Sequence, residues 1–284
     1  MSYPLKQLLT FFKMPRSTFY YTLSQLNHAD KYADLKKDIV KWFKDSHETY
    51  GYRRIFLLAQ QAGYPYCMET IRRIMHQELG LCPTIYNQRR RKYSSYRGNI
   101  GKIAPNLLNQ HFDTTEPYRV LHTDITQIRM ENGNFGYISA VLDEGSHEIL
   151  AIQTSSHPDT KLILDTLAQL PTFDNSATSV LIHSDQGWHY QLAYYRNELK
   201  QHHLIQSMSR KGNCHDNAPM ESFFNLLKRE CLKRTEIKNI NQLQQKVKNY
   251  VGWYNTKRIS FKLNGMSPCQ YRQKKLATVN TITS

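Results

Sequence analysis

Cysteine, long apolar runs and acidic residues are all scarce in this chain of 284 residues. The five cysteines show no paired spacing, which argues against a disulfide framework or a zinc finger and favours a reducing compartment. No apolar segment approaches the ~20 residues that a membrane-spanning helix needs. The segment from Met1 to Lys6 lacks the apolar core of a signal peptide. We therefore expect a cytoplasmic protein that makes no membrane contact.

The shortage of acidic side chains is uneven along the chain. Residues 1–110 carry 18 basic against 7 acidic side chains, residues 111–195 carry 3 against 11, and residues 196–284 carry 17 against 5. The formal net charge is +15. An acidic segment between two basic ones is typical of a metal site flanked by surfaces that hold a polyanion. The pattern favours nucleic acid as the partner over a merely soluble basic protein.

Three carboxylates stand out in the middle of the chain. Asp124 interrupts the apolar run 120–126, Asp185 ends the run 180–185, and both runs read as strands. Glu221 lies on an expected helix further along. Carboxylates brought together repel one another, and a divalent cation removes the cost of burying them. Oxygen ligands suit Mg²⁺ or Mn²⁺ rather than zinc, and paired ions of this kind support in-line phosphoryl displacement.

Short helices separated by turns are expected through residues 1–87. One helix runs from Leu5 to Phe12, and Ser17 is placed to cap a second that ends near Leu26. This is the outline of a helix-turn-helix, but any small helical bundle shares it. DNA contact and plain helix packing are equally open for this first unit.

A second helical unit carries a clearer division of faces. One helix opens at residues 50–54 and runs to about Ala62, and another covers residues 68–79 with Gly80 as its C-terminal cap. The latter buries an apolar stripe and turns basic and amide groups outward, as a DNA-recognition helix requires. An ordinary solvated helix face is the alternative. The side chains expected to contact DNA here are Arg53, Arg54, Arg72 and Arg73.

Residues 88–115 are expected to form a basic linker. It opens with four consecutive cations, namely Arg89, Arg90, Arg91 and Lys92. A run of this kind is often a disordered tail. Between two globular units of a protein that handles DNA, we expect it to follow phosphates without reading sequence.

Alternating strand and helix signals predict an α/β unit over residues 116–275. Strands are expected at 118–128, 135–142, 148–154, 179–184 and 204–208, and helices at 160–170 and 192–202. The Asn132-Gly133 pair predicts a hairpin between the first two strands. The predicted fold is a mixed five-stranded sheet with flanking helices, preceded by an all-α region and followed by a tail at 276–284.

The expected helix around Glu221 places a cation near the third carboxylate. Met220, Phe223 and Leu227 share an apolar stripe, while Glu221 and Lys228 lie on the neighbouring face two turns apart. Either polar residue alone is as well explained by solvation or by the helix dipole. Together with the two strand aspartates, they indicate a site that handles phosphate.

Three motifs carry a family resemblance. The segments His183-Ser184-Asp185-Gln186-Gly187 and Gly212-Asn213-Cys214-His215-Asp216-Asn217-Ala218-Pro219-Met220-Glu221, followed by Lys228, resemble the core of bacterial insertion-sequence transposases of the retroviral-integrase type. Nearly the whole chain is similar to the second-frame product of the insertion-sequence-three-like family. The resemblance implies a ribonuclease-H-like core whose aspartate–aspartate–glutamate triad is Asp124, Asp185 and Glu221.

The resemblance also implies a reaction and partners. Two Mg²⁺ or Mn²⁺ ions held by the triad would support nicking of the element's end and attack by the freed 3′-hydroxyl on another strand. Lys228 would touch a phosphate near the scissile bond, the helical units would bind terminal inverted repeats, and the 241–258 region with Arg258 would hold flanking or target DNA. A homo-oligomer of at least two chains, a partner from the upstream frame, and a bacterial, nucleoid-associated location follow.

The chain departs from the family pattern at a few positions. Gln186, Trp188 and His189 replace residues that the family often has after its second aspartate, and His122 stands where an aromatic is frequent. These changes leave the carboxylates intact and bear on substrate contacts. His122 and His183 each precede an aspartate by two residues, so they share its strand face. They would either orient carboxylates, ligate metal or, as we favour, serve as hydrogen-bonded core histidines.

Two other functions remain open from the sequence. A non-catalytic DNA-binding regulator would use the helical units and keep a silent core, but intact carboxylates weigh against it. A nuclease of the ribonuclease-H class would cut DNA without joining it, and the tandem helical units and Lys228 weigh against that reading.

Overall fold

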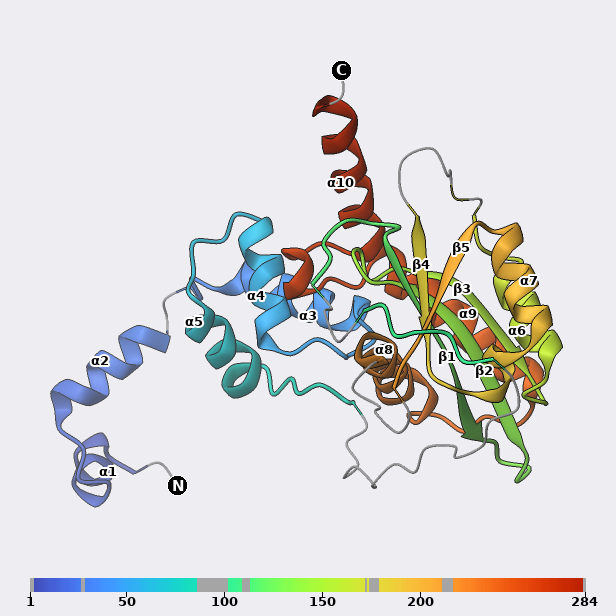
Figure 1. Ribbon diagram of the computed structural model, residues 1–284. Helices are drawn as coiled ribbons and strands as arrows, with labels where there is room; N and C mark the ends of the chain where they lie inside the picture. The colour runs from blue at the N-terminus through green and yellow to red at the C-terminus, as the bar shows by residue number, and fades with distance from the viewer. Residues whose placement is uncertain are drawn as a thin grey trace.

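A five-stranded mixed sheet forms the centre of the computed structural model, which describes residues 3–26, 29–85, 102–108, 113–171, 173, 179–210 and 217–282 (Figure 1). The strands are β1 (Val120–Arg129), β2 (Phe135–Asp143), β3 (Ile149–Ser155), β4 (Val180–Ser184) and β5 (Leu204–Met208). Their order is β3-β2-β1-β4-β5; β1, β2 and β3 pair antiparallel, and β4 lies parallel to both β1 and β5. The predicted mixed five-stranded sheet is confirmed.

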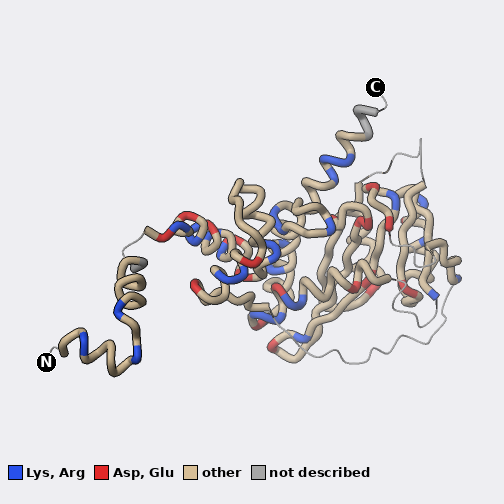
Figure 2. The backbone as a smooth tube through the Cα atoms, turned by 90° about the vertical axis from the view of Figure 1, so that its left-hand side faces the viewer, with Lys and Arg blue, Asp and Glu red and all other residues tan. Residues whose placement is uncertain are grey.

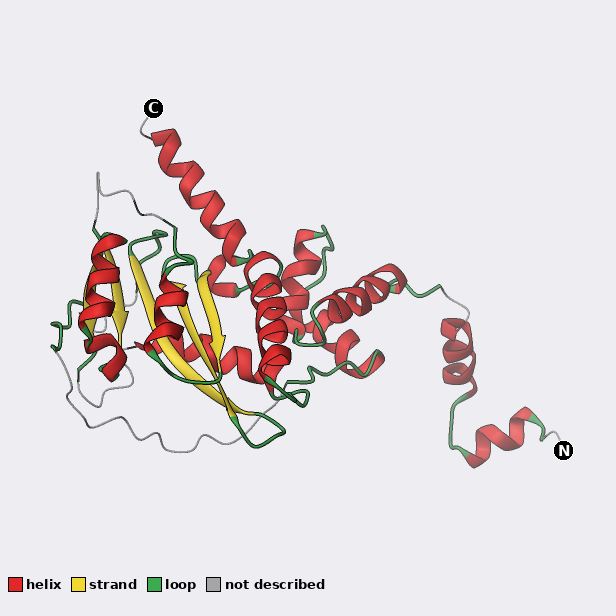
Figure 3. Ribbon diagram, turned by 90° about the vertical axis from the view of Figure 1, so that its right-hand side faces the viewer, coloured by secondary structure: helices red, strands yellow, loops and turns green. Residues whose placement is uncertain are grey.

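Helices cover both faces of the sheet (Figure 3). Helices α6 (Thr160–Leu167) and α7 (Ala193–Gln201) pack on one face, and α8 (Ala218–Leu227) and α9 (Ile240–Thr256) pack on the other. Strand β2 shows the division: Ile138, Ala140 and Leu142 belong to the α8–α9 core, whereas Val141 belongs to the α6–α7 core. Because side chains alternate along a strand, one buried strand feeds both cores.

A separate helical core precedes the sheet. It contains α3 (Ala33–Asp45), α4 (Tyr52–Gln61) and α5 (Met68–Arg73), which continues into the π-helical turn η1 (Ile74–Glu78). The two helices predicted at 50–62 and 68–79 are therefore present. Helix α3 was not predicted, although its buried Leu35, Ile39 and Phe43 recur every four residues and gave the signal.

Helices α1 (Leu5–Phe11) and α2 (Arg16–Leu26) lie apart from the rest of the structure (Figure 1). Both predicted helices of the first unit are present, and α1 buries none of its residues. Helix α2 begins at Arg16, so Ser17 lies inside its first turn and the expected cap at Ser17 is wrong. The α1–α2 pair accordingly draws no stability from the helical core.

The C-terminal segment links the two cores. After α9 the chain forms the short helix η5 (Phe261–Leu263) and then α10 (Pro268–Ile282), which protrudes from the body (Figure 1). Trp253 of α9 and Ile259, which follows α9, pack into the core of α3–α5. Val251 of α9 belongs to the core between α8, α9 and the sheet. Figure 2 shows the Lys and Arg residues of α10, which has no acidic residue among its 15.

The structure also bears on the expectation that the chain makes no membrane contact. No helix among the described residues has the length and apolarity that crossing a membrane requires. The domain boundaries at 87, 115 and 275 stay predictions. Trp253 packs against both the helical core and the α8–α9 core of the sheet.

Candidate active site

The register of β1 and β4 brings the two aspartates onto neighbouring strands in the centre of the sheet. His122 of β1 pairs with His183 of β4 in parallel register, and each aspartate follows its histidine by two residues. Asp124 lies opposite Ala140 of β2, whose side chain belongs to the core under α8 and α9. Asp124 thus shares the sheet face that α8 covers, and Asp185 follows the carboxyl end of the neighbouring strand.

The surroundings of both aspartates oppose their ionisation. Burial and the neighbouring charge of Asp185 raise the pKa of Asp124 well above its ordinary value, with a smaller rise from Glu221 and an opposing effect of Lys228. Burial also raises the pKa of Asp185, against the backbone N–H of Gly187, which donates to its Oδ1 at 2.8 Å. A bound cation would lower the pKa of both carboxyl groups, because a nearby positive charge favours their ionised forms.

Glu221 reaches the same region from α8. The helix packs on β1 and β2 through Met220, Phe223 and Leu227, which leaves Glu221 exposed in its first turn. The charge of Glu221 contributes to the raised pKa of Asp124. Within the described part of the chain, no three histidine, cysteine or carboxylate side chains already converge tightly enough to hold an ion.

Lys228 points toward the strand that carries Asp124. It opens the π-helical turn η4 (Lys228–Leu232) that continues α8, and its Nζ donates to Thr126 Oγ1. Thr126 follows Asp124 by two residues and therefore lies on the same strand face. Burial and Lys233 lower the pKa of Lys228, whereas Asp124 opposes that shift. The ammonium is held at Thr126, and its charge interacts with that of Asp124.

The loop after β4 fits closely around Asp185. A Cβ added to Gly187 would lie 2.9 Å from Asp185 Oδ1 and 3.4 Å from the Tyr190 ring. Tyr190 belongs to the short helix η2 (Trp188–Gln191) and is almost completely buried. Burial and the charges of Asp124 and Asp185 raise the pKa of Tyr190 well above its usual value. Glycine at 187 therefore lets this loop approach the carboxylate.

Comparison with known proteins shows the family of the chain. The integrase core domain family covers residues 114–214 and 221–276, and an HTH-like domain family covers residues 30–92. The putative transposase InsK for insertion sequence element IS150 of Escherichia coli K12 is 41% identical over 272 residues, which are 96% of this chain and 94% of that protein. The chain belongs to the transposases of bacterial insertion sequences. It is a DDE-type polynucleotidyl transferase with an integrase core.

Other relatives of the transposase differ in length. The probable transposase for insertion sequence element IS1353 of Shigella flexneri is 32% identical over 274 residues, which are 96% of this chain and 52% of that protein. A solved intasome of simian T-cell lymphotropic virus in complex with a PP2A regulatory subunit aligns over 82% of this chain and 74% of that chain. The TM-score is 0.46 and the sequence identity 13%.

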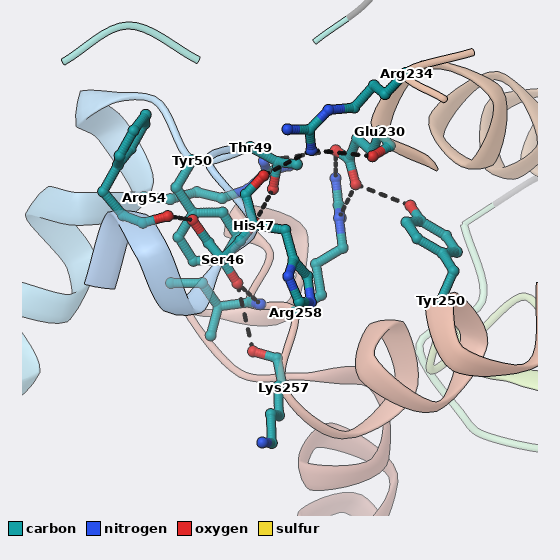
Figure 4. A network of polar contacts seen from close by, with 12 residues as sticks. Ser46, His47, Thr49, Tyr50, Arg54, Glu230, Arg234, Tyr250, Lys257 and Arg258 are labelled. Atoms are coloured by element: carbon teal, nitrogen blue, oxygen red, sulfur yellow. Dashed lines mark hydrogen bonds and ion pairs between the residues drawn. The ribbon is translucent and has the colours of Figure 1, made fainter. Parts of the chain in front are cut away.

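Two of the arginines predicted to bind DNA in the transposase have structural roles instead. Arg258 is only 4% exposed, and its Nε and Nη2 donate to the two carboxylate oxygens of Glu230 at 2.8 and 2.7 Å. Arg54 lies 3.9 Å from the same carboxylate with 24% of its side chain exposed, and it stacks on Tyr50. Figure 4 shows this network between α4, η4 and α9. The burial of Arg258 against Glu230 argues against its predicted DNA contact, and Arg54 contributes to the same network.

The remaining predicted DNA contacts stay predictions. Arg53 is exposed on α4 next to the half-buried Arg54. Arg72 and Arg73 are exposed on α5, where they pair with Glu69 and Glu78 at 2.7 Å. The cations Arg89, Arg90, Arg91 and Lys92 lie outside the described residues.

The core histidines hold hydrogen bonds, as favoured from the sequence. His122 and His183 are both 0% exposed. The His183 ring pairs through Nδ1 with Ser207 of β5 at 2.9 Å, and the His122 ring contacts Asn217 and Glu144. Of the unusual residues after Asp185, Gln186 donates to the Ser209 carbonyl at 2.9 Å. It is thus tied within the protein rather than set toward a substrate.

Sequence reasoning missed several partners of the site. Thr126, Asn217 and Glu230 each contact a residue distant in the chain, so local patterns mark them weakly at most. A partial signal exists for Thr126, because it is a polar residue two positions after Asp124 on a buried strand. Glu230 gives a weaker one, since it is the only acidic residue in the turn Lys228–Leu232.

Gly187→Ala is expected to lower the transposase's turnover by about ten- to a hundredfold, because the new Cβ must displace the Asp185 carboxylate. Gly252→Ala in α9 is the matched control: nothing lies within 4 Å of its Cβ, and an alanine there favours the helix. Rates of DNA cleavage and thermal unfolding of both variants provide the measurement. Equal rates for Gly187→Ala and wild type would show that Asp185 does not need its observed position.

Asp124→Asn is expected to stabilise the metal-free transposase in a pH-dependent manner. The folded state raises the pKa of Asp124 above the ordinary 3.8, so neutral Asp124 is favoured on folding. That contribution is fully present below the unfolded pKa and is lost as pH rises through the folded pKa. The advantage of asparagine should be absent near pH 4 and grow toward pH 8, as measured by thermal unfolding in EDTA. A difference that does not change with pH would contradict the raised pKa.

Proposed function

We propose that the transposase binds the terminal inverted repeats of its element, nicks the element's ends, and transfers the 3′-hydroxyl to a second DNA strand. The observation that carries the proposal is Asp124, a half-buried carboxyl beside the charges of Asp185, Glu221 and Lys228. A non-catalytic regulator would have no need of this arrangement, because it opposes ionisation and therefore disfavours the folded protein at neutral pH.

The three carboxylates suit a hard divalent cation. All candidate donors are oxygens. Burial raises the pKa of both Asp124 and Asp185, and a bound cation would favour their charged forms. Asp124, Asp185 and Glu221 would hold Mg²⁺ or Mn²⁺, and we expect two ions. Such ions, when bound, activate the attacking oxygen and stabilise the leaving oxygen of an in-line displacement.

The chain's own residues would position the DNA for this chemistry. Lys228, held at Thr126, is placed to meet a phosphate that approaches Asp124. The α3–α5 unit, with its HTH-like match, would hold the terminal repeat. Because two DNA ends must meet in one complex, we expect at least a dimer. The longer relative of Shigella flexneri is consistent with a further segment from an upstream frame as partner. The bacterial nucleoid would then be its place of action.

A strand-transfer assay with the full chain tests the proposed function. The purified protein is incubated with an end-labelled duplex that carries the element's terminus, a target plasmid and Mg²⁺, Mn²⁺ or EDTA. We expect nicked and joined products with either metal and none with EDTA. Nicked product without joined product would favour the nuclease alternative. Sequence-specific binding without either product, also after addition of the upstream-frame protein, would overturn the proposal in favour of a regulator.

Arg53 and Arg54 offer a neighbouring pair with opposite expected effects. Arg53→Ala should weaken DNA binding and reduce the slope of log K against log salt by about 0.9, since one phosphate contact is lost. Arg54→Ala should instead lower the thermal stability, because it removes a cation beside Glu230. Fluorescence anisotropy at several salt concentrations and thermal unfolding measure the two effects. An unchanged slope for Arg53→Ala would remove Arg53 from the DNA-binding surface.

A further inference from the structure

The residue that precedes α8 does not cap its own helix. Asn217 occupies the N-cap position, where asparagine ordinarily accepts a hydrogen bond from the first helical turn. Its side chain makes no such bond. Instead its Nδ2 donates to the main-chain carbonyl of Thr123 at 3.1 Å, and its Oδ1 lies 2.9 Å from His122 Nδ1. The side-chain amide therefore joins α8 to strand β1.

The orientation of this amide fixes the direction of its bond with His122. The Thr123 carbonyl can only accept, so the Asn217 Nδ2 must face it. The Asn217 Oδ1 then faces the imidazole, and His122 Nδ1 donates to it. Reversal of the amide would place two acceptors against each other at Thr123. The two bonds therefore fix the orientation of the Asn217 amide and make His122 Nδ1 the donor to its oxygen.

The other ring nitrogen of His122 also has a buried partner. Nε2 lies 2.7 Å from Oε2 of Glu144, which is 4% exposed directly after β2. The backbone N–H of Thr114 donates to the other carboxylate oxygen of Glu144 at 3.1 Å. His122 itself is 0% exposed. The imidazole is thereby clamped between the end of β2 and the start of α8.

His122 and Asn217 are each close in sequence to a carboxylate of the candidate active site. Asp124 follows His122 by two residues on β1, and Glu221 is the fourth residue after Asn217 on α8. The Glu144–His122–Asn217 contacts thus tie the strand of one carboxylate to the helix of another. His183 is equally buried at the paired position, and its Nδ1 bonds to Ser207 of the neighbouring strand β5.

We propose that His122, braced by Glu144 and Asn217, is a positioning residue that sets Glu221 against Asp124. The inference rests on the proposed metal-dependent function, for which these carboxylates must converge. Loss of the brace lets the start of α8 shift relative to β1, so the site loses Glu221 as a ligand while Asp124 and Asp185 keep their places. Residues that orient ligands in this manner typically change metal affinity by about 10- to 100-fold.

The test is Mn²⁺ affinity, measured by calorimetry on the full chain without DNA. His122→Phe keeps a buried ring without either hydrogen bond and should weaken Mn²⁺ binding by about tenfold or more. In a Glu221→Gln background, His122→Phe should have no further effect, because the ligand it positions is already lost. His183→Phe is the matched control, and its effect should be the same with or without Glu221. Equal effects of His122→Phe in both backgrounds would overturn the proposal.

Two further variants keep the test informative if His122→Phe fails to fold. Asn217→Ala should reproduce the loss of affinity and its dependence on Glu221. Glu144→Gln should retain near wild-type affinity, since glutamine can accept from Thr114 and donate to His122 Nε2. Wild-type affinity for Asn217→Ala would refute the brace. If wild type binds no Mn²⁺, or Glu221→Gln has no effect, the proposed function fails first, and that outcome is distinct from failure of the brace.

Discussion

Asp185→Asn is expected to lower the rate of strand joining by about a thousandfold or more, while DNA affinity stays within about twofold of wild type. Asparagine keeps the shape of the side chain and an oxygen that can accept from the Gly187 N–H. It removes the negative charge that a divalent cation requires of its ligand. The variant therefore separates the chemistry of the site from its packing.

The measurement is joined product per unit time at saturating DNA, beside anisotropy for binding and thermal unfolding for integrity. Because burial raises the pKa of Asp185, the neutral side chain should leave metal-free stability equal to wild type or higher. A variant that joins strands at the wild-type rate would exclude Asp185 from the reaction. One that unfolds at lower temperature would show that its charge stabilises the fold instead.

Glu230→Ala is expected to destabilise the protein by about 3–5 kcal/mol, because it leaves Arg258 buried without its partner. The Glu230 and Arg258 side chains are 3% and 4% exposed. Tyr250 also donates its hydroxyl to Glu230 Oε2 at 2.8 Å (Figure 4). Burial alone would raise the pKa of Glu230, but Arg258 and Arg54 hold it below its ordinary value. The stabilisation is therefore present at neutral pH and is lost as pH falls through that lowered pKa.

Urea unfolding at pH 7 measures this loss. Asp165→Ala is the control, since its ion pair with Lys161 joins side chains that are 41% and 77% exposed. Exposed pairs of this kind contribute about 0–1 kcal/mol. A loss for Glu230→Ala as small as that of the control would contradict the structural role assigned to the network. It would also reopen Arg258 to a role in DNA binding.

Strand and helix positions were predictable because local patterns define them. The strand expected at 204–208 matches β5, and those expected at 135–142 and 179–184 differ from β2 and β4 by one residue at one end. Apolar runs ended by Gly, Asn and Asp carry that information. The helix expected around Glu221 is also present, and α8 continues directly into η4, which begins at Lys228.

The buried polar contacts were not predictable, because their partners are far apart in the chain. Arg258 meets Glu230 across 28 residues and His122 meets Asn217 across 95. An arginine on a basic helix reads as a DNA contact until its carboxylate partner is known. In the same manner, Asn217 reads as a helix cap, and only the packing of α8 on β1 directs its amide to Thr123.

The most direct test of the central claim is a change of metal preference in Asp185→Cys. Thiolate is a poor ligand for Mg²⁺ but a better one for softer ions such as Mn²⁺. Joined product is measured for wild type and variant in each metal. If Asp185 ligates the catalytic ion, the Mn²⁺-to-Mg²⁺ ratio of joining rates should rise by about tenfold or more in the variant. The same ratio in both proteins, with activity retained, would contradict the account.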